Sequence, residues 1–110
     1  MKSRNATNAF AALGHETRLA LYRRLVKAGP AGVGAGDLAD VLGISPSSLT
    51  FHVAQLERAD LVASRREGRR IIYTADFGAM GEVVDFLTQE CCGGHPEVCG
   101  VLKKSRSRTS

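Results

Sequence analysis

Three cysteines close together near the end of the sequence carry its most specific chemical signal. Cys91 and Cys92 are adjacent, and Cys99 follows a segment that contains Gly93 and Gly94. The two glycines let the chain reverse, so that the three sulfur atoms can converge on one centre. Thiolates are soft ligands that select soft ions. Three thiolates, without a fourth ligand, complete the coordination of trivalent arsenic or antimony, which bind three sulfur atoms in a pyramid with a lone pair at the apex.

Other occupants of this site stay open at the level of the sequence. Zinc prefers four ligands, and His95 offers a fourth donor, but adjacent cysteines diverge and hold a tetrahedral ion poorly. Binding of cadmium or lead, redox sensing through a disulfide, and a cluster that binds no ligand are further alternatives. We expect arsenite, or antimonite, to bind Cys91, Cys92 and Cys99, and we expect no organic cofactor. Because the number of cysteines is odd, the pattern is a poor disulfide framework.

The bulk composition indicates one small domain with a polyanionic partner. The chain has 110 residues, of which 44% are hydrophobic and only 5% aromatic, so a single, thin aliphatic core is expected. Cores of this size are often completed by a second copy. The net charge of +4 favours a polyanion. The sequence shows no secretory signal and no apolar run near the ~20 residues that cross a bilayer, so we expect a cytoplasmic protein without membrane contact.

The stretch from Asp37 to Val62 has the pattern of two helices joined by a tight turn. Leu38, Val41 and Leu42 form an apolar stripe on the first helix. Gly43 supplies a left-handed stop, Ser45 an N-cap, and Pro46 the first position of the second helix. This is the layout of a helix-turn-helix, whose second helix lies in a DNA major groove. An ordinary pair of packed amphipathic helices is the alternative.

The second helix divides into an apolar and a polar face. Leu49, Val53 and Leu56 are expected in the core. The side chains predicted to contact DNA are Ser45, Ser47, Ser48, Thr50, Phe51, His52 and Gln55. Among them we expect Ser47, Ser48, Thr50 and Gln55 to reach bases, and Phe51 to touch a thymine methyl group. Ser45 and His52 would contact phosphates.

Residues Val62 to Thr74 are predicted to form a β-hairpin with Gly68 at its turn. The tip holds four arginines around Glu67, and their mutual repulsion favours an anionic ligand. They are Arg65, Arg66, Arg69 and Arg70. Beside a DNA-reading helix this hairpin is a wing that contacts phosphates, although a merely soluble hairpin tip is the alternative.

Three further helices are expected. The first covers Ala6 to Leu13, with Ala6, Ala9, Phe10 and Leu13 on one face. The second covers Glu16 to Ala28, with Leu19, Tyr22, Leu25 and Val26 directed inward. Its basic residues Arg18, Arg23, Arg24 and Lys27 lie mostly outward, as a solvated face or, alternatively, as phosphate contacts. A glycine-rich connector from Gly29 to Gly36 follows, with room for a short strand around Val33. His15, like His52, is assigned a structural or phosphate-contacting role.

The last helix, predicted over Asp76 to Cys92, carries an apolar seam longer than one small domain can bury. We expect this seam to pair with the first helix and with the same helix of a second subunit, although burial wholly within one subunit is the alternative. The predicted dimer interface is Phe10, Leu13, Phe77, Met80, Val84 and Leu87. Residues 1–101 would thus form one DNA-binding and dimerisation domain, and residues 102–110 a disordered basic tail.

In order and in motif, the chain resembles the ArsR/SmtB family of metal-responsive winged helix-turn-helix repressors. The matching segments are Leu13 to Leu25, Gly36 to Val62 and Ser64 to Thr74. The resemblance implies a mainly α fold with a small β-hairpin, a homodimer, and a repressor that an inducer releases from operator DNA.

Two family sites are absent from this sequence. Where some arsenic-sensing members have a Cys-Val-Cys-Asp-Leu run, this chain has Gly34, Ala35, Gly36, Asp37 and Leu38. The last helix offers Asp85 but no histidine for the family's zinc site. The cluster of Cys91, Cys92 and Cys99 resembles instead the C-terminal site of another arsenic-responsive subgroup.

Together these features predict a metalloid-responsive repressor, released when trivalent arsenic or antimony binds the three thiolates. A repressor that responds to cadmium, lead or zinc, or to thiol oxidation, is the alternative. We do not expect an enzyme, because a thiol reductase would need a C-x-x-C pair or a base near the thiols. A DNA-binding module with structural zinc is a further alternative.

Overall fold

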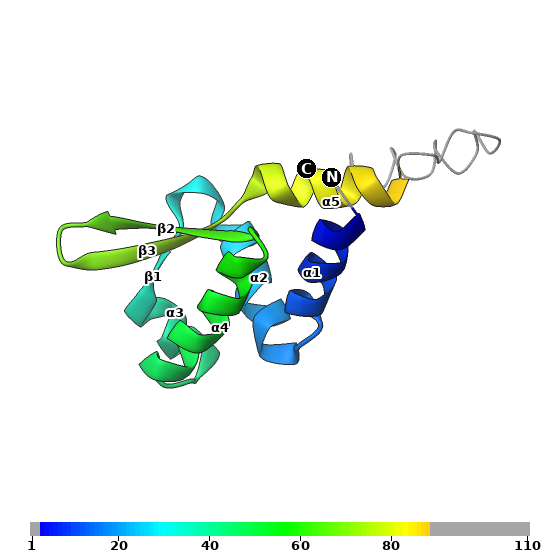
Figure 1. Cartoon of the computed structure of the whole chain (residues 1–110). Helices are drawn as coiled ribbons and strands as arrows, with labels where there is room; N and C mark the ends of the chain where they lie inside the picture. Colours follow the sequence, from blue (N-terminus) through cyan, green and yellow to red (C-terminus); the bar gives the residue numbers. More distant parts are fainter. Residues whose placement is uncertain (1–2, 89–110) are drawn as a thin grey trace.

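A computed structural model describes residues 3–88 of the chain (Figure 1). Its elements in order are α1 (Ser3–Leu13), α2 (Glu16–Ala28), the 3-10 turn η1 (Gly29–Ala31), β1 (Val33–Gly34), α3 (Ala35–Leu42), α4 (Pro46–Arg58), β2 (Val62–Glu67), β3 (Arg70–Ala75) and α5 (Phe77–Thr88). The predicted mainly α fold with a small β-hairpin is confirmed. The cysteine cluster and the predicted tail 102–110 lie outside the described residues. Within residues 3–88, no helix is long and apolar enough to cross a membrane.

The sheet has three antiparallel strands in the order β1-β3-β2. The hairpin pairs Val62 with Ala75 and Glu67 with Arg70, which leaves Gly68 and Arg69 as a two-residue turn. Gly68 has φ 63°, a backbone conformation that glycine adopts without steric cost. The short strand expected around Val33 is present and pairs with Tyr73. The hairpin extends away from the helices in Figure 1, as a wing does.

The core is mainly aliphatic, as the composition predicts, and it also contains the rings of Tyr22 and Tyr73. Its most deeply buried large side chains are Leu21, Leu25, Leu38, Leu49, Val53, Leu56 and Leu61. No polar or charged residue within 3–88 is buried. The core lies where α2, α3 and α4 meet the sheet, and α1 covers it with Ala6, Ala9 and Ala12.

Two side chains expected to face inward are exposed, so those predictions of helix phase are wrong. Leu21 and Leu25 define the inward face of α2. Leu19 precedes Leu21 by two residues, which is a rotation of about 200° around the helix, so its side chain points away from the core and is 46% exposed. Val41 is 51% exposed, and Ala39 takes its place beside Leu38 in the core. Phe10, which is predicted to lie at the dimer interface, is exposed in the single chain because α1 packs through its alanines.

Helix bounds also differ from the prediction at three N-termini. α1 begins at Ser3 instead of Ala6, α3 begins at Ala35 instead of Asp37, and α5 begins at Phe77 instead of Asp76. Gly36 is therefore helical, although glycine-rich sequence argues locally against a helix. By contrast, the predicted bounds of α2 match the structure.

The turn between α3 and α4 has the predicted chemistry. Gly43 is left-handed, with φ 66° and ψ 34°, and its N–H donates to the carbonyl of Asp40. The next N–H, of Ile44, donates to the carbonyl of Ala39, so two carbonyl groups at the end of α3 are satisfied. The Ser45 hydroxyl then accepts from the Ser48 N–H at 3.1 Å and caps α4. These local bonds fix the angle at which α4 leaves α3.

Candidate nucleic-acid interface

α4 presents a small, polar and exposed surface on the side opposite the core. Leu49, Val53 and Leu56 anchor the helix, as expected. Four of the predicted DNA-contacting residues are exposed on it: Ser47, Ser48, Thr50 and Phe51. The aromatic ring of Phe51 is the most unusual of these, because 57% of the residue is exposed and nothing in the core requires it there. An exposed ring on such a helix can contact a thymine methyl group.

Hydrogen bonds within the chain limit some of these side chains. The Thr50 hydroxyl donates to the Pro46 carbonyl at 3.0 Å, so it faces a base only as an acceptor. The hydroxyl groups of Ser45 and Ser47 lie 3.2 Å apart. Ser45 already accepts from the Ser48 N–H, so its contact with a phosphate would have to use its own proton.

Gln55 and His52 lie on a flank of α4 and not on its most exposed face. Both are half-buried. Gln55 lines a hollow of about 290 Å³ between α1 and α4, together with Asn8, Arg18 and Arg58. That Gln55 contacts bases stays a prediction. The structure places Gln55 beside the cations Arg18 and Arg58 and the neutral Asn8, which suit a phosphate.

The four arginines of the wing fall into two pairs. Arg65 donates to the carbonyls of Pro30 and Ala31, at 3.1 and 2.8 Å, and its Nε lies 3.6 Å from Glu67. Arg70 donates to Asp37. The sequence predicts mutual repulsion that favours an anionic ligand, but for these two arginines acceptors come from distant segments of the chain itself. Within residues 3–88, Arg66 and Arg69 have no ion pair, and both are exposed.

The pattern of a capped, polar-faced helix beside an arginine-tipped wing is matched by known proteins. A family model described as a helix-turn-helix domain matches residues 13–65. The HTH-type transcriptional regulator YgaV of Escherichia coli K12 is 30% identical over 81 residues, which cover 74% of this chain and 80% of YgaV. An ArsR-like transcriptional regulator from Rhodococcus sp. RHA1 superimposes with a TM-score of 0.71 at 26% identity, over 91% of this chain and 92% of that one.

This chain belongs to the ArsR family of helix-turn-helix transcriptional regulators. Reduced HlyU from Vibrio cholerae N16961 is another similar structure, with a TM-score of 0.62, 27% identity, and coverage of 82% of this chain and 92% of HlyU. The family resemblance read from Leu13–Leu25, Gly36–Val62 and Ser64–Thr74 is thus confirmed. These similarities assign the family and not the arsenic-responsive subgroup.

The ArsR-family fold also brings together a cluster that the sequence did not reveal. Arg18, expected to be solvated, is half-buried and donates from Nε to Nδ1 of His52 at 3.3 Å. The rings of His15 and His52 lie 4.9 Å apart. Partial burial, with the nearby charges of His15 and Arg18, lowers the pKa of His52 below its usual value of 6.5. The only sequence signal was the spacing of His15 and Arg18, which places them on the same face of one helical turn.

The predicted inducer site cannot be placed. Cys91, Cys92, Cys99 and His95 lie outside the described residues. Within residues 3–88, no group of three histidine, cysteine or acidic side chains is arranged to hold a metal ion. That the family's other two sites are missing, inferred from Gly34–Leu38 and from the lack of a histidine beside Asp85, stays a prediction from the sequence.

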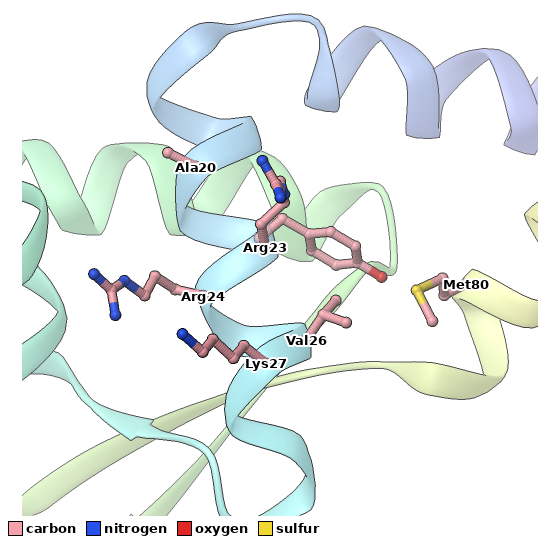
Figure 2. Close-up of a pocket in the computed structure, with 7 residues that line it drawn as sticks. Ala20, Arg23, Arg24, Val26, Lys27 and Met80 are labelled. Atoms are coloured by element: carbon pink, nitrogen blue, oxygen red, sulfur yellow. The ribbon is translucent and has the colours of Figure 1, made fainter. Parts of the chain in front are cut away.

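A groove of about 720 Å³ separates α2 from α5. Figure 2 shows Met80 reaching from α5 toward Val26 on α2, while Arg24 and Lys27 project from the other side of α2. Tyr22 lines the same groove, and its buried hydroxyl has no hydrogen-bond partner among the described residues. Burial, and secondarily the charge of Asp76, raise the pKa of Tyr22 above 10.0. Met80 of α5 and Val26 of α2 thus give this groove an apolar lining.

The predicted seam residues form incompletely buried surface on α1 and α5, which contact each other. Phe10, Phe77 and Leu87 are 44%, 37% and 61% exposed. Leu13, Met80 and Val84 are half-buried. Only Val83 of α5 is fully in the core of the described chain.

Proposed function

We propose that the chain is a homodimeric repressor that binds operator DNA and is released by trivalent arsenic or antimony. The observation that carries the DNA-binding part is the exposed polar face of α4, capped at Ser45 and flanked by the free arginines of the wing. Ser47, Ser48 and Phe51 face the bases, whereas Arg66 and Arg69 contact phosphates beside the groove. Nothing in this assembly requires catalysis, and we propose no enzymatic activity.

The homodimer is supported by the apolar surface that one chain leaves uncovered. Phe10 on α1 and Leu87 on α5 are large, apolar and exposed on two helices in contact with each other. Burial of such surface against a second copy is favourable by about 25 cal/mol per Å². Among similar structures, Mb0332 from Mycobacterium bovis is a homodimeric winged helix-turn-helix DNA-binding domain. A two-fold dimer would direct two copies of α4 toward successive major grooves.

The inducer part is supported by the sequence alone. Cys91, Cys92 and Cys99 would hold the ion as three thiolates, and binding would release thiol protons. The cluster follows α5, which contributes to the seam and lines a groove with α2 through Met80. α2 in turn holds His52 of α4 through Arg18. A change at the end of α5 can therefore alter both the dimer contact and the support of α4. Allosteric couplings of ~1–3 kcal/mol are typical and would weaken DNA binding about 5–150-fold.

One titration tests both parts. A duplex is first selected from a random-sequence library with the wild-type protein, and binding is followed by fluorescence anisotropy. Arsenite, antimonite, cadmium and zinc are then added to the complex. We expect arsenite or antimonite to release the wild-type protein and the Val98→Ser control, but not Cys99→Ser.

The outcomes separate the alternatives. Failure to select any duplex would refute DNA binding. Release by cadmium or zinc but not by arsenite would assign the site to another soft metal, and release by a thiol oxidant would assign it to redox sensing. Stoichiometric zinc in the purified protein, with unfolding by a chelator, would indicate a structural role instead.

A further inference from the structure

His15, Arg18 and His52 form a cluster of hydrogen-bond donors at one flank of α4. His15 precedes α2 and caps it by accepting from the Thr17 N–H at Nδ1, across 3.2 Å. Arg18 lies one turn further along α2 and donates from Nε to Nδ1 of His52, across 3.3 Å. The two imidazole rings stand 4.9 Å apart. Residues from two helices, distant in sequence, are thus gathered at one place.

The hydrogen bonds determine where the imidazole protons lie. In a neutral histidine one ring nitrogen donates and the other accepts. Because Nδ1 accepts in both His15 and His52, the proton of each neutral ring is on Nε2. The cluster therefore offers two Nε2–H groups and the terminal nitrogens of Arg18. Within residues 3–88, no acidic side chain forms an ion pair with any of the three.

The surroundings extend this donor surface along α4. Arg18 also lines the hollow between α1 and α4, where Asn8, Gln55 and Arg58 are the other polar residues. None of these is acidic. On the other side of the cluster, the ring of His52 touches that of Phe51 on the exposed face of α4. In Figure 1 the α1–α2 corner lies to one side of α4 and the wing to the other.

We propose that His15, Arg18 and His52 together bind a phosphate group of the DNA backbone beside α4, on the side opposite the wing. This inference rests on the proposed DNA-binding function and deepens it. Charge-assisted hydrogen bonds from a guanidinium group to phosphate are among the stronger polar contacts. With the wing on the opposite side, α4 would be held in the groove from both flanks. Phosphate contacts of this kind fix the register of a reading helix.

The test uses the full chain and the duplex selected above. In Arg18→Gln the charge is removed, and in the control Arg23→Gln the same charge is removed from the same helix, at the groove that faces α5. We expect Arg18→Gln to bind the duplex about tenfold more weakly or worse, with a smaller salt dependence, and Arg23→Gln to bind within about twofold of wild type. Thermal unfolding of both variants establishes that they fold.

A methylphosphonate scan identifies the contact itself. Neutral methylphosphonates are placed one at a time along the duplex. We expect one or two positions to weaken wild-type binding but to add nothing in Arg18→Gln, as coupled partners do. His15→Asp, which keeps an N-cap but adds a negative charge, should lose affinity, and His15→Asn should lose less. If every methylphosphonate loss persists in Arg18→Gln, Arg18 acts only by positioning His52 and the proposal is overturned. Failure to select a duplex would instead refute the proposed function.

Discussion

Arg70 on β3 donates a hydrogen bond from Nη2 to Oδ2 of Asp37 on α3, across 3.1 Å. The pair links the wing to the first helix of the helix-turn-helix. Arg65 makes a second link, from β2 to the carbonyls of η1. Both links are exposed, so each contributes little to global stability. Their effect is to orient the hairpin relative to α3 and α4, and they leave Arg66 and Arg69 as the free cations of the wing.

Substitution of the wing arginines should therefore give two different results. We expect Arg66→Gln and Arg69→Gln each to lower the slope of log affinity against log salt by about one, since each removes one phosphate contact. Arg65→Gln and Arg70→Gln should weaken binding with a smaller change in slope, because they loosen the hairpin. Anisotropy titrations over a series of salt concentrations measure both quantities. Equal changes in slope for all four variants would contradict this separation of phosphate-contacting arginines from arginines that orient the hairpin.

Local chemistry explains what could be predicted from the sequence. The turn at Gly43, Ser45 and Pro46 depends on residues adjacent in the chain, and so does the hairpin turn at Gly68. Each is determined by φ preferences and side-chain caps that act within a few residues. The polar face of α4 could be predicted for a similar reason, because helical periodicity separates it from Leu49, Val53 and Leu56.

Tertiary neighbours explain what could not be predicted. Whether Leu19 or Leu21 faces inward depends on which side of α2 the sheet and α4 cover, and both residues suit a core. Arg65 finds its acceptors in η1, and Arg18 finds His52, across more than thirty positions of sequence. No pattern of neighbouring residues in the sequence predicts such pairs. The predicted inducer site, at Cys91, Cys92 and Cys99, lies outside the described residues and stays a prediction.

Glycine substitutions should distinguish a crowded turn from an open helix. Gly32 has φ 72°, and a Cβ there would lie 2.6 Å from the Tyr73 carbonyl oxygen. We expect Gly32→Ala to lower the free energy of unfolding by about 2 kcal/mol or more, from strain and displacement of β1. Gly36 lies on α3 with open space around it, so Gly36→Ala should stabilise by up to about 1 kcal/mol. Urea denaturation at one protein concentration measures both, and similar effects of the two changes would contradict this explanation.

The lowered pKa of His52 should make stability depend on pH. Below the ordinary value of 6.5 the unfolded chain takes up a proton that the folded chain resists, because burial, His15 and Arg18 disfavour the charged ring. The free energy of unfolding should therefore decrease as pH falls below 6.5. We expect His52→Gln, which can still accept from Arg18, to lose less stability between pH 7.5 and pH 5.5 than wild type. Urea denaturation at the two pH values tests this. If His52→Gln loses as much free energy of unfolding as wild type between the two pH values, His52 is not the cause.

The exposed seam predicts the oligomeric state. Leu87 on α5 is 61% exposed in the single chain, and burial of a carboxylate at this position in a dimer would leave it without a partner. Breaking a buried contact with an unpaired charge costs about 3–5 kcal/mol, so Leu87→Glu should raise the dimer dissociation constant at least about 100-fold. Ile71→Glu is the matched control, since Ile71 is 40% exposed on β3 and outside the predicted seam. Sedimentation equilibrium should show dimers for wild type and Ile71→Glu but monomers for Leu87→Glu. If Leu87→Glu remains dimeric, the two copies meet through another surface, and the spacing of the two α4 helices must be derived from that surface.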